Sequence, residues 1–420
     1  MRTVEIVTFG CRLNAFESEA IERAAGQAGL ADAVIVNTCA VTAEAERQAR
    51  QAIRRARREF PGRKIIVTGC AATLAPEKYA ALADVVLDNE AKLRVESYDP
   101  HPPTAAPWAP PSPASGRGLE FAPRPLTGEG VERSETRRAR AYLQVQQGCD
   151  HRCTFCIIPY ARGPSRSIPI GAIVGEARRM VEAGCREIVL TGVDLTAYGA
   201  DLPGRPSLGQ MARRLLALVP ELPRLRLSSL DPSEIDDDLW RLFASEERLM
   251  PHLHLSLQAG DDLVLKRMKR RHSRDDAIGV ARRARELRPE AAIGADLIAG
   301  FPTEDDEMFG RSLDIVEECG IAFLHVFPYS PRPGTPAARM PAVAPALVRE
   351  RAARLRAAGA ARLVRELGSR VGQSGDVLIE KEGVGRAAFY ARVLVDGEPG
   401  SVRRVRFVGA EGGRLIGATA

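Results

Sequence analysis

The sequence lacks any long apolar run. Its 420 residues contain no stretch of about 18 consecutive apolar residues, so we expect no transmembrane helix. The opening stretch TVEIVTFG is typical of a strand, and it shows neither the basic region nor the apolar core of a secretory signal. We therefore expect a cytoplasmic protein with no membrane partner.

The sequence also lacks a second CxxC pair. Eight cysteines are present, and in a reducing compartment metal binding or catalysis accounts for cysteines better than disulfides do. Structural zinc sites usually take four ligands in two pairs, yet no CxxC occurs besides Cys153–Cys156. This pattern disfavours a structural zinc site.

Charge is only modestly unbalanced. The formal net charge is +6, which fits a polyanionic partner, although many enzymes are basic without binding nucleic acid. No internal repeat of fixed period is present, which argues against a solenoid. Charge alone therefore leaves a nucleic-acid partner open.

The first 98 residues predict a small α/β domain. Residues 3–9, 33–38 and 64–69 are short runs rich in Val, Ile or Thr, and helical patterns lie between them. This alternation is typical of a parallel sheet. Residues 99–136 are instead crowded with Pro, Gly and Ser, so we interpret them as a linker or insertion.

The remaining sequence predicts three further parts. Residues 137–342 hold six candidate strands, the first five followed by helical patterns, which indicates an open, partial (β/α)6 barrel with functional groups at the carboxyl ends of its strands. Residues 343–370 form an Arg/Ala-rich helical connector. Residues 371–420 alternate like short strands between glycine turns and predict a small β-domain.

Three cysteines lie within eight residues in QGCDHRCTFCIIPYARG: Cys149, Cys153 and Cys156. Iron–sulfur clusters are held by cysteine thiolates, and a 4Fe–4S cube has four corners. Three thiolates would leave one iron open for a substrate or cofactor, as catalytic metal sites do. The alternative, a set of buried thiols without metal, does not explain this tight spacing.

The stretch GCDHRCTFCIIPYARGPSRS resembles the CxxxCxxC signature of radical S-adenosylmethionine (SAM) enzymes, and specifically of the methylthiotransferases. The resemblance implies that Cys149, Cys153 and Cys156 hold a 4Fe–4S cluster whose open iron binds SAM. It also implies that the cluster's electron cleaves SAM to a 5′-deoxyadenosyl radical, and that Phe155 packs near SAM.

Three more cysteines each follow a predicted strand: Cys11, Cys39 and Cys70. A single cysteine at such a place is more often core packing, but three at the same structural position can converge at one edge of a parallel sheet. The pattern resembles the methylthiotransferase N-terminal domain, which implies a second, auxiliary 4Fe–4S cluster that carries the sulfur. We expect Cys185 and Cys319 to be structural.

Further matches run along the barrel. The segments EIVLTGVDLTAYG, LHLSLQAGDDLVLKRMKRRHSR, GADLIAGFPTEDDEMF and FLHVFPYSPRPGTPAARM resemble blocks of the same family. The resemblance implies a SAM pocket built with Phe155, Gly192, Ser256, Gln258, Asp296 and Tyr329.

The basic run KRMKRRHSR predicts contacts with RNA phosphate, although a solvated helix face is the usual reason for such a run. The residues concerned are Lys266, Arg267, Lys269, Arg270 and Arg271. The terminal β-domain resembles a TRAM domain, which implies RNA binding. Phe389 and Tyr390 are candidates for stacking on bases or, equally, for the domain core.

The resemblance implies a tRNA methylthiotransferase that acts on C2 of N6-threonylcarbamoyladenosine beside the anticodon. Its implied partners are a tRNA anticodon stem-loop and a reductant such as flavodoxin, and we expect a monomer. Two related substrates remain open, isopentenyladenosine in tRNA and an aspartate of a ribosomal protein. A non-catalytic iron–sulfur or zinc RNA-binding module is the alternative from another class, but it leaves the SAM-like segments unexplained.

Overall fold

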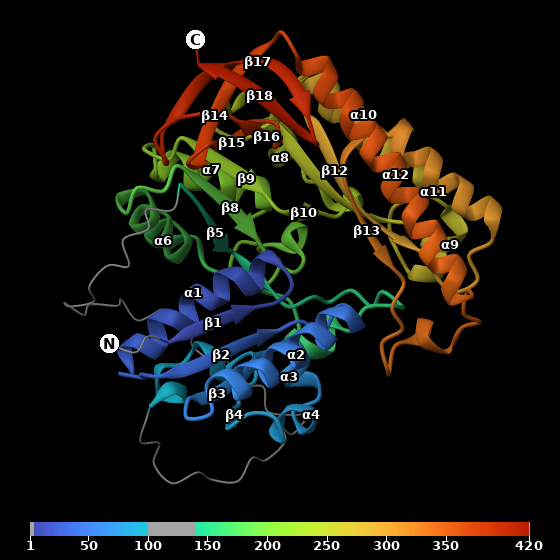
Figure 1. The fold of residues 1–420 in the computed structure, drawn as a ribbon. Coiled ribbons are helices and arrows are strands. Elements are labelled where there is room, and N and C mark those ends of the chain that lie inside the picture. The colour runs from blue at the N-terminus through green and yellow to red at the C-terminus, as the bar shows by residue number, and fades with distance from the viewer. Residues whose placement is uncertain (1–3, 100–138, 420) are drawn as a thin grey trace. The chain divides into compact units, whose positions relative to one another are not determined.

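A computed structural model describes residues 4–99 and 139–419, and the chain divides into two compact units (Figure 1). All but the first residue of the predicted linker at 99–136 lie outside the described residues. Within the described ranges, no helix combines the length and the apolar character that crossing a bilayer requires.

The first unit is a four-stranded parallel sheet in the order β1-β2-β3-β4. Strand β2 (Ala33–Thr38) is buried at every position, as expected for a strand covered on both faces. The other strands are β1 (Glu5–Thr8), β3 (Lys64–Gly69) and β4 (Val85–Val86). The sheet confirms the predicted α/β class.

Helices alternate with these strands. They are α1 (Arg12–Gln27), α2 (Ala43–Glu59), α3 (Cys70–Leu74) and α4 (Glu77–Ala80). Helix α2 is rich in arginine but buries a stripe of Ala49, Ile53 and Ala56. That spacing of four and three residues places the apolar side chains on one face, so the charged residues stay in solvent.

The second unit contains the partial barrel. Strands β5 (Arg140–Gln144), β8 (Glu187–Thr191) and β9 (Arg224–Leu227) form one parallel sheet. Strands β10 (Ser229–Leu230), β11 (His252–Gln258), β12 (Ala292–Ala299) and β13 (Ile321–Pro328) form the next. Because β10 follows β9 after one residue, the two sheets continue one another as six strand positions, which confirms the predicted (β/α)6 arrangement.

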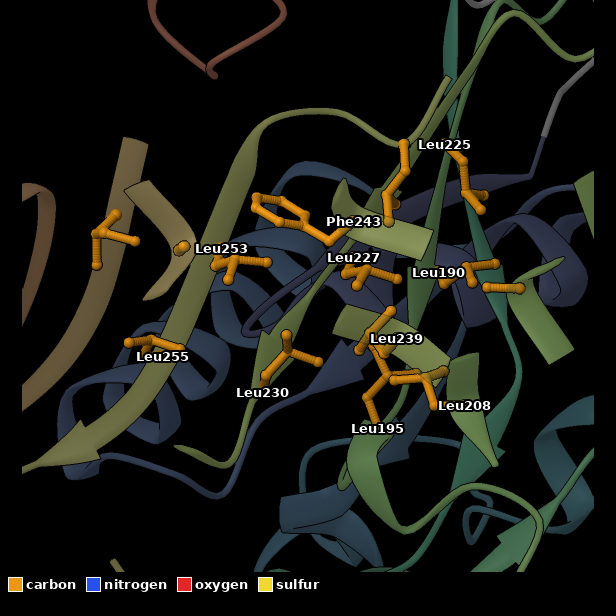
Figure 2. Packing of buried hydrophobic residues seen from close by; sticks show 14 of the residues in the cluster. Leu190, Leu195, Leu208, Leu225, Leu227, Leu230, Leu239, Phe243, Leu253 and Leu255 are labelled. Carbon is orange, nitrogen blue, oxygen red and sulfur yellow. The ribbon is translucent and has the colours of Figure 1, made fainter. Parts of the chain in front are cut away.

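Helices follow each of the first five strand positions. They are α6 (Ile170–Glu182), α7 (Leu208–Leu218), α8 (Asp237–Ser245), α9 (Asp262–Met268), α10 (Arg274–Leu287) and α11 (Asp306–Glu318). Their apolar faces and the strands share one core, where Leu190, Leu227, Leu253 and Phe243 meet (Figure 2). This core holds the carboxyl ends of the strands, and thus the site, in place.

Helix α12 (Pro345–Arg370) runs along β13 and leads into a closed barrel (Figure 1). The barrel strands are β14 (Ser374–Lys381), β15 (Val384–Ala387), β16 (Arg392–Leu394), β17 (Val402–Glu411) and β18 (Arg414–Thr419). Its core includes Ala292 of β12 and packs against Phe323 of β13. The β-rich C-terminal part is therefore built onto the partial barrel.

Candidate active site

The loop that carries Cys149, Cys153 and Cys156 lies between β6 (Gln146–Gln147) and α5 (Ile158–Arg162). All three cysteines are half-buried. Gly148 has a φ of +73°, and a Cβ there would lie 1.9 Å from the carbonyl oxygen of Pro164. Only glycine fits this close approach, which folds the loop back on the chain that follows it.

Charged groups surround these thiols. The Cys149 thiol lies 3.6 Å from Asp194 Oδ2, and Arg270 Nη1 lies 3.6 Å from Cys153 Sγ. Burial raises the pKa of Cys149, and the charges of Asp194, Cys156 and Cys153 act in the same direction. Burial and negative charge thus disfavour the thiolate form of Cys149 unless a cation balances it, and a set of three cysteines is the donor type that holds an iron–sulfur cluster.

His151 lies inside the same loop and pairs with Asp194, its Nε2 standing 2.8 Å from Oδ2. The hydrogen bonds to Asp194 and Glu234 raise the pKa of His151 to about 10. The imidazolium is therefore charged at neutral pH, and it offsets the carboxylate beside Cys149. His151 was not predicted from the sequence, because the cysteine spacing carries no signal for it.

A pocket of about 220 Å³ opens at the carboxyl ends of β11, β12 and β13. Four of the six residues predicted for SAM line it: Phe155, Gln258, Asp296 and Tyr329. Ile298 and the segment 327–330 complete the wall on the barrel side. The pocket joins apolar and aromatic walls to a few polar groups, as small-molecule sites do.

The other two predicted SAM residues do not line this pocket. A Cβ on Gly192 would lie 2.9 Å from Oε1 of Gln146, so this glycine allows two protein segments to approach. The Ser256 carbonyl accepts a hydrogen bond from Arg270. The pairing of β11 with β12 is irregular between Leu255 and Gln258, and Gln258 has a φ of +70°. Ser256 lies within this irregular stretch, and Gln258 at its end lines the pocket.

Asp296 is held by two histidines that the sequence analysis did not single out. His254 Nε2 and His325 Nδ1 lie 2.9 Å and 3.2 Å from its Oδ1. Burial works against ionisation, but the charge and hydrogen bonds of the histidines outweigh it and lower the pKa of Asp296. The pocket therefore holds an ionised carboxylate that can accept hydrogen bonds from ligand hydroxyls. The signal in the sequence was the HLH repeat of β11, in which histidines alternate with leucine as side chains on one face of a strand do.

The basic run divides into exposed and engaged side chains. Lys266, Lys269 and Arg271 are exposed, and Arg271 pairs with Glu234. Arg267 donates to the carbonyl of Thr303, and Arg270 turns inward to Cys153. Arg270 is thus engaged inside the protein and does not join the exposed cations that suit phosphate.

In the first unit, three cysteines lie at the carboxyl ends of adjacent parallel strands. Thr38 pairs with Gly69 across β2 and β3, so Cys39 and Cys70, the next residues, are neighbours. A Cβ on Gly10 would lie 2.7 Å from Cys39 Sγ, which brings the segment before Cys11 to the same edge. Cys11 is exposed and the other two are buried.

Buried polar groups fix this edge. Asn14 Nδ2 donates to the carbonyls of Phe9 (2.7 Å) and Thr38 (3.0 Å). Asn89 Nδ2 lies 3.8 Å from Cys70 Sγ, and Lys92 Nζ donates to Asn89 Oδ1 over 2.8 Å. Such a shell orients cysteine ligands, so the donor set fits a second cluster.

The remaining cysteines and Phe389 are buried, and Tyr390 is partly buried. Cys185 and Cys319 belong to the core of the partial barrel. Phe389 is buried in the core of the C-terminal barrel, and the Tyr390 ring stacks on His252 with centroids 4.4 Å apart. These contacts favour core packing as the role of Phe389, and they place the Tyr390 ring against the partial barrel.

Two family models match this chain, one in each of its two units. Residues 143–316 match the model of the radical SAM superfamily, and residues 3–88 match uncharacterized protein family UPF0004. The structure of the radical SAM methyltransferase TsrM from Kitasatospora setae, with cobalamin and a [4Fe-4S] cluster bound, aligns with a TM-score of 0.53. That alignment covers 80% of this chain and 74% of TsrM at 15% identity, so it shows a shared fold.

Curated relatives match over nearly the whole chain. The threonylcarbamoyladenosine tRNA methylthiotransferase MtaB of Rickettsia prowazekii is 48% identical over 418 residues, which cover 98% of this chain and 96% of that protein. Its namesake in Thermotoga maritima is 37% identical over 81% of this chain and 77% of its own length. A tRNA-2-methylthio-N(6)-dimethylallyladenosine synthase of Ruegeria is 34% identical over 98% of this chain and 97% of its own length. The chain belongs to the radical SAM methylthiotransferase family, whose enzymes use 4Fe–4S clusters and SAM to transfer sulfur-containing groups.

Proposed function

We propose that this enzyme adds a methylthio group to C2 of N6-threonylcarbamoyladenosine in the anticodon stem-loop of tRNA. The observation that carries the proposal is the presence of two three-cysteine sets. One lies at the carboxyl edge of the parallel sheet of the first unit, and the other lies on the loop after β6, shortly beyond the end of the parallel strand β5. The relative with 48% identity bears the name of this activity, which favours threonylcarbamoyladenosine over dimethylallyladenosine.

Each part of the site has a distinct task in this proposal. Cys149, Cys153 and Cys156 would hold the cluster that binds SAM, and Cys11, Cys39 and Cys70 would hold the auxiliary cluster. When bound, the first cluster together with SAM would supply a 5′-deoxyadenosyl radical, and the auxiliary cluster would supply the sulfur that is transferred.

The chain's own residues bind and orient. Phe155 and Ile298 offer apolar walls to a flat base, and Asp296 offers an acceptor to hydroxyl groups. The exposed cations Lys266, Lys269 and Arg271 would neutralise RNA phosphates. A flavodoxin-like electron donor, a monomeric state and a cytoplasmic location complete the proposal.

Nucleoside mass spectrometry of tRNA from a strain without this gene tests the substrate. We expect the methylthio mark to disappear from threonylcarbamoyladenosine and to stay on isopentenyladenosine. Loss on isopentenyladenosine alone would refute our choice. A mark lost from neither nucleoside would point to a protein substrate.

A single cysteine variant tests the chemistry in vitro. We expect Cys153→Ala to abolish 5′-deoxyadenosine formation from SAM under reducing conditions, because the cluster loses a ligand. The matched control is Cys185→Ala, which removes a thiol from the core of the same unit and should leave the product in place. Formation of 5′-deoxyadenosine by Cys153→Ala would contradict the assignment.

A further inference from the structure

Arg270 has a largely buried side chain, whereas its neighbours Lys269 and Arg271 are exposed. Its side chain is 9% exposed. The preceding residue, Lys269, ends helix α9 in the left-handed conformation with a φ of +58°, and Arg270 N–H donates to the carbonyl of Leu265 over 2.9 Å. This helix ending, usually made with glycine, turns the chain so that Arg270 points into the protein.

The guanidinium makes three contacts that fix its direction. Nη2 donates to Asp231 Oδ2 over 2.7 Å and to the Ser256 carbonyl over 2.8 Å, while Nη1 lies 3.6 Å from Cys153 Sγ. Asp231 is itself held by Ser233, whose N–H and hydroxyl both donate to its Oδ1. The planar fork of arginine can meet all three partners at once, which a lysine ammonium cannot do.

The cysteine loop is fastened to the same helix end. Thr154, the residue after Cys153, donates from its N–H to the carbonyl of Met268 (3.1 Å) and from its hydroxyl to that of Arg267 (2.8 Å). These bonds satisfy carbonyls that a helix terminus leaves without intrahelical partners. They also fix Cys153 relative to Arg270, so the contact between them is built into the fold.

We propose that Arg270 is a positioning residue of the radical cluster, which acts through Cys153 to make reduction of that cluster easier. Reduction adds one electron to a centre ligated by thiolates. A cationic donor directed at a ligand sulfur stabilises the added negative charge, and hydrogen bonds to sulfur are known levers on cluster potential. The proposal rests on Cys153 as a cluster ligand and is independent of the RNA substrate.

The test measures the reduction midpoint of this cluster by EPR during a titration with titanium(III) citrate. The full-length chain carries Cys11→Ala, Cys39→Ala and Cys70→Ala, so that one cluster contributes to the signal. Into this background we introduce Arg270→Gln, Arg270→Lys and, as matched control, Lys266→Gln. The control removes one positive charge from an exposed side chain of α9, the helix that ends just before Arg270.

We expect Arg270→Gln to lower the ratio of reduced to oxidised cluster at fixed solution potential about tenfold, equivalent to about 59 mV for one electron. Arg270→Lys should also lower the midpoint, because the lysine ammonium pairs with Asp231 and no longer donates to the sulfur of Cys153. Lys266→Gln should match the parent.

Two results would overturn the proposal: midpoints equal to the parent in both Arg270 variants, or an equal shift in Lys266→Gln. If Arg270→Gln does not retain iron, the test compares the reduction midpoint of Arg270→Lys with that of the parent. Equal midpoints would then overturn the proposal. Neither result depends on methylthio transfer, so failure here is distinct from failure of the proposed function.

Discussion

Gly69 shows how closely the backbone packs around the buried cysteines of the first unit. It directly precedes Cys70 and has a φ of +97°. A Cβ there would lie 2.3 Å from the carbonyl oxygen of Thr38 and 2.5 Å from its nitrogen. Both atoms are backbone of the central strand, so no side-chain movement relieves the clash.

We therefore expect Gly69→Ala to displace Cys70 and to release the auxiliary cluster. This backbone conformation is essentially restricted to glycine and costs a residue with a Cβ about 1–3 kcal/mol, and the clash adds to that cost. Iron analysis of the reconstituted chain should show about half of the parent's iron. Gly62→Ala is the control, since nothing lies within 4 Å of its Cβ. Full iron content in Gly69→Ala would contradict this account.

Glu187 is a buried carboxylate whose contribution to stability depends on pH. It is buried and forms ion pairs with Arg140, Arg224 and Arg226, at 2.9 Å, 3.1 Å and 2.9 Å. Burial opposes its ionisation, but the three arginines outweigh burial and lower the pKa of Glu187 from 4.5 to about 2. Its ionised form therefore stabilises the folded state above pH 4.5, and this contribution fades as the pH falls towards 2.

Replacement by glutamine leaves the three guanidinium groups without their shared counter-charge. We expect Glu187→Gln to lower the free energy of unfolding at pH 7 by about 3–5 kcal/mol, the usual effect of breaking a buried pair. Urea unfolding of the cluster-free full-length chain at pH 7 and pH 3 should show a smaller difference from the parent at pH 3. An equal difference at both values would refute the assigned role.

At the scale of elements, the turn between β15 and β16 packs onto the strands of the partial barrel. The carbonyls of Arg386 and Ala388 accept from Arg224 and Arg226 of β9. Tyr390 has a φ of +83° and meets Phe323 edge to face with centroids 5.2 Å apart. A backbone in this conformation persists only where its surroundings enforce it. The turn therefore fastens the C-terminal barrel to β9, β11 and β13.

We expect Tyr390→Ala to loosen this attachment. Loss of a packed aromatic side chain costs about 3–5 kcal/mol, so the C-terminal strands should open more often. Limited proteolysis should cut the variant in the C-terminal barrel before it cuts the parent. Tyr160→Ala is the control, because that side chain is 62% exposed. Equal cutting rates in all three proteins would show that the Tyr390 side chain does not hold the C-terminal barrel in place.

How far the elements were predictable depends on whether local signals decide them. Cys39 and Cys70 follow strands whose apolar runs are unmistakable, so their shared edge followed from the sequence. Arg270 did not, because its direction is set by a left-handed Lys269 where no glycine marks the turn. Ser256 does not line the pocket that Gln258 lines, and the irregular pairing between them has no sequence signal.

At the scale of the whole molecule, the two cysteine sets belong to separate compact units. Each unit has its own parallel sheet and its own buried core. The shell around Cys70 comes from Asn89 and Lys92, within the first unit, and the shell around Cys153 comes from the second. Each cluster should therefore assemble without the other.

Two triple variants of the full chain test this independence. The parent should take up about eight irons on anaerobic reconstitution, and each triple replacement of cysteines by alanine should take up about four. With Cys11, Cys39 and Cys70 replaced, the remaining cluster should still produce 5′-deoxyadenosine, but no methylthio product should form. With Cys149, Cys153 and Cys156 replaced, neither product should appear, although iron stays bound. About four irons in the parent, or loss of all iron from either triple variant, would show that the two sets do not hold independent clusters.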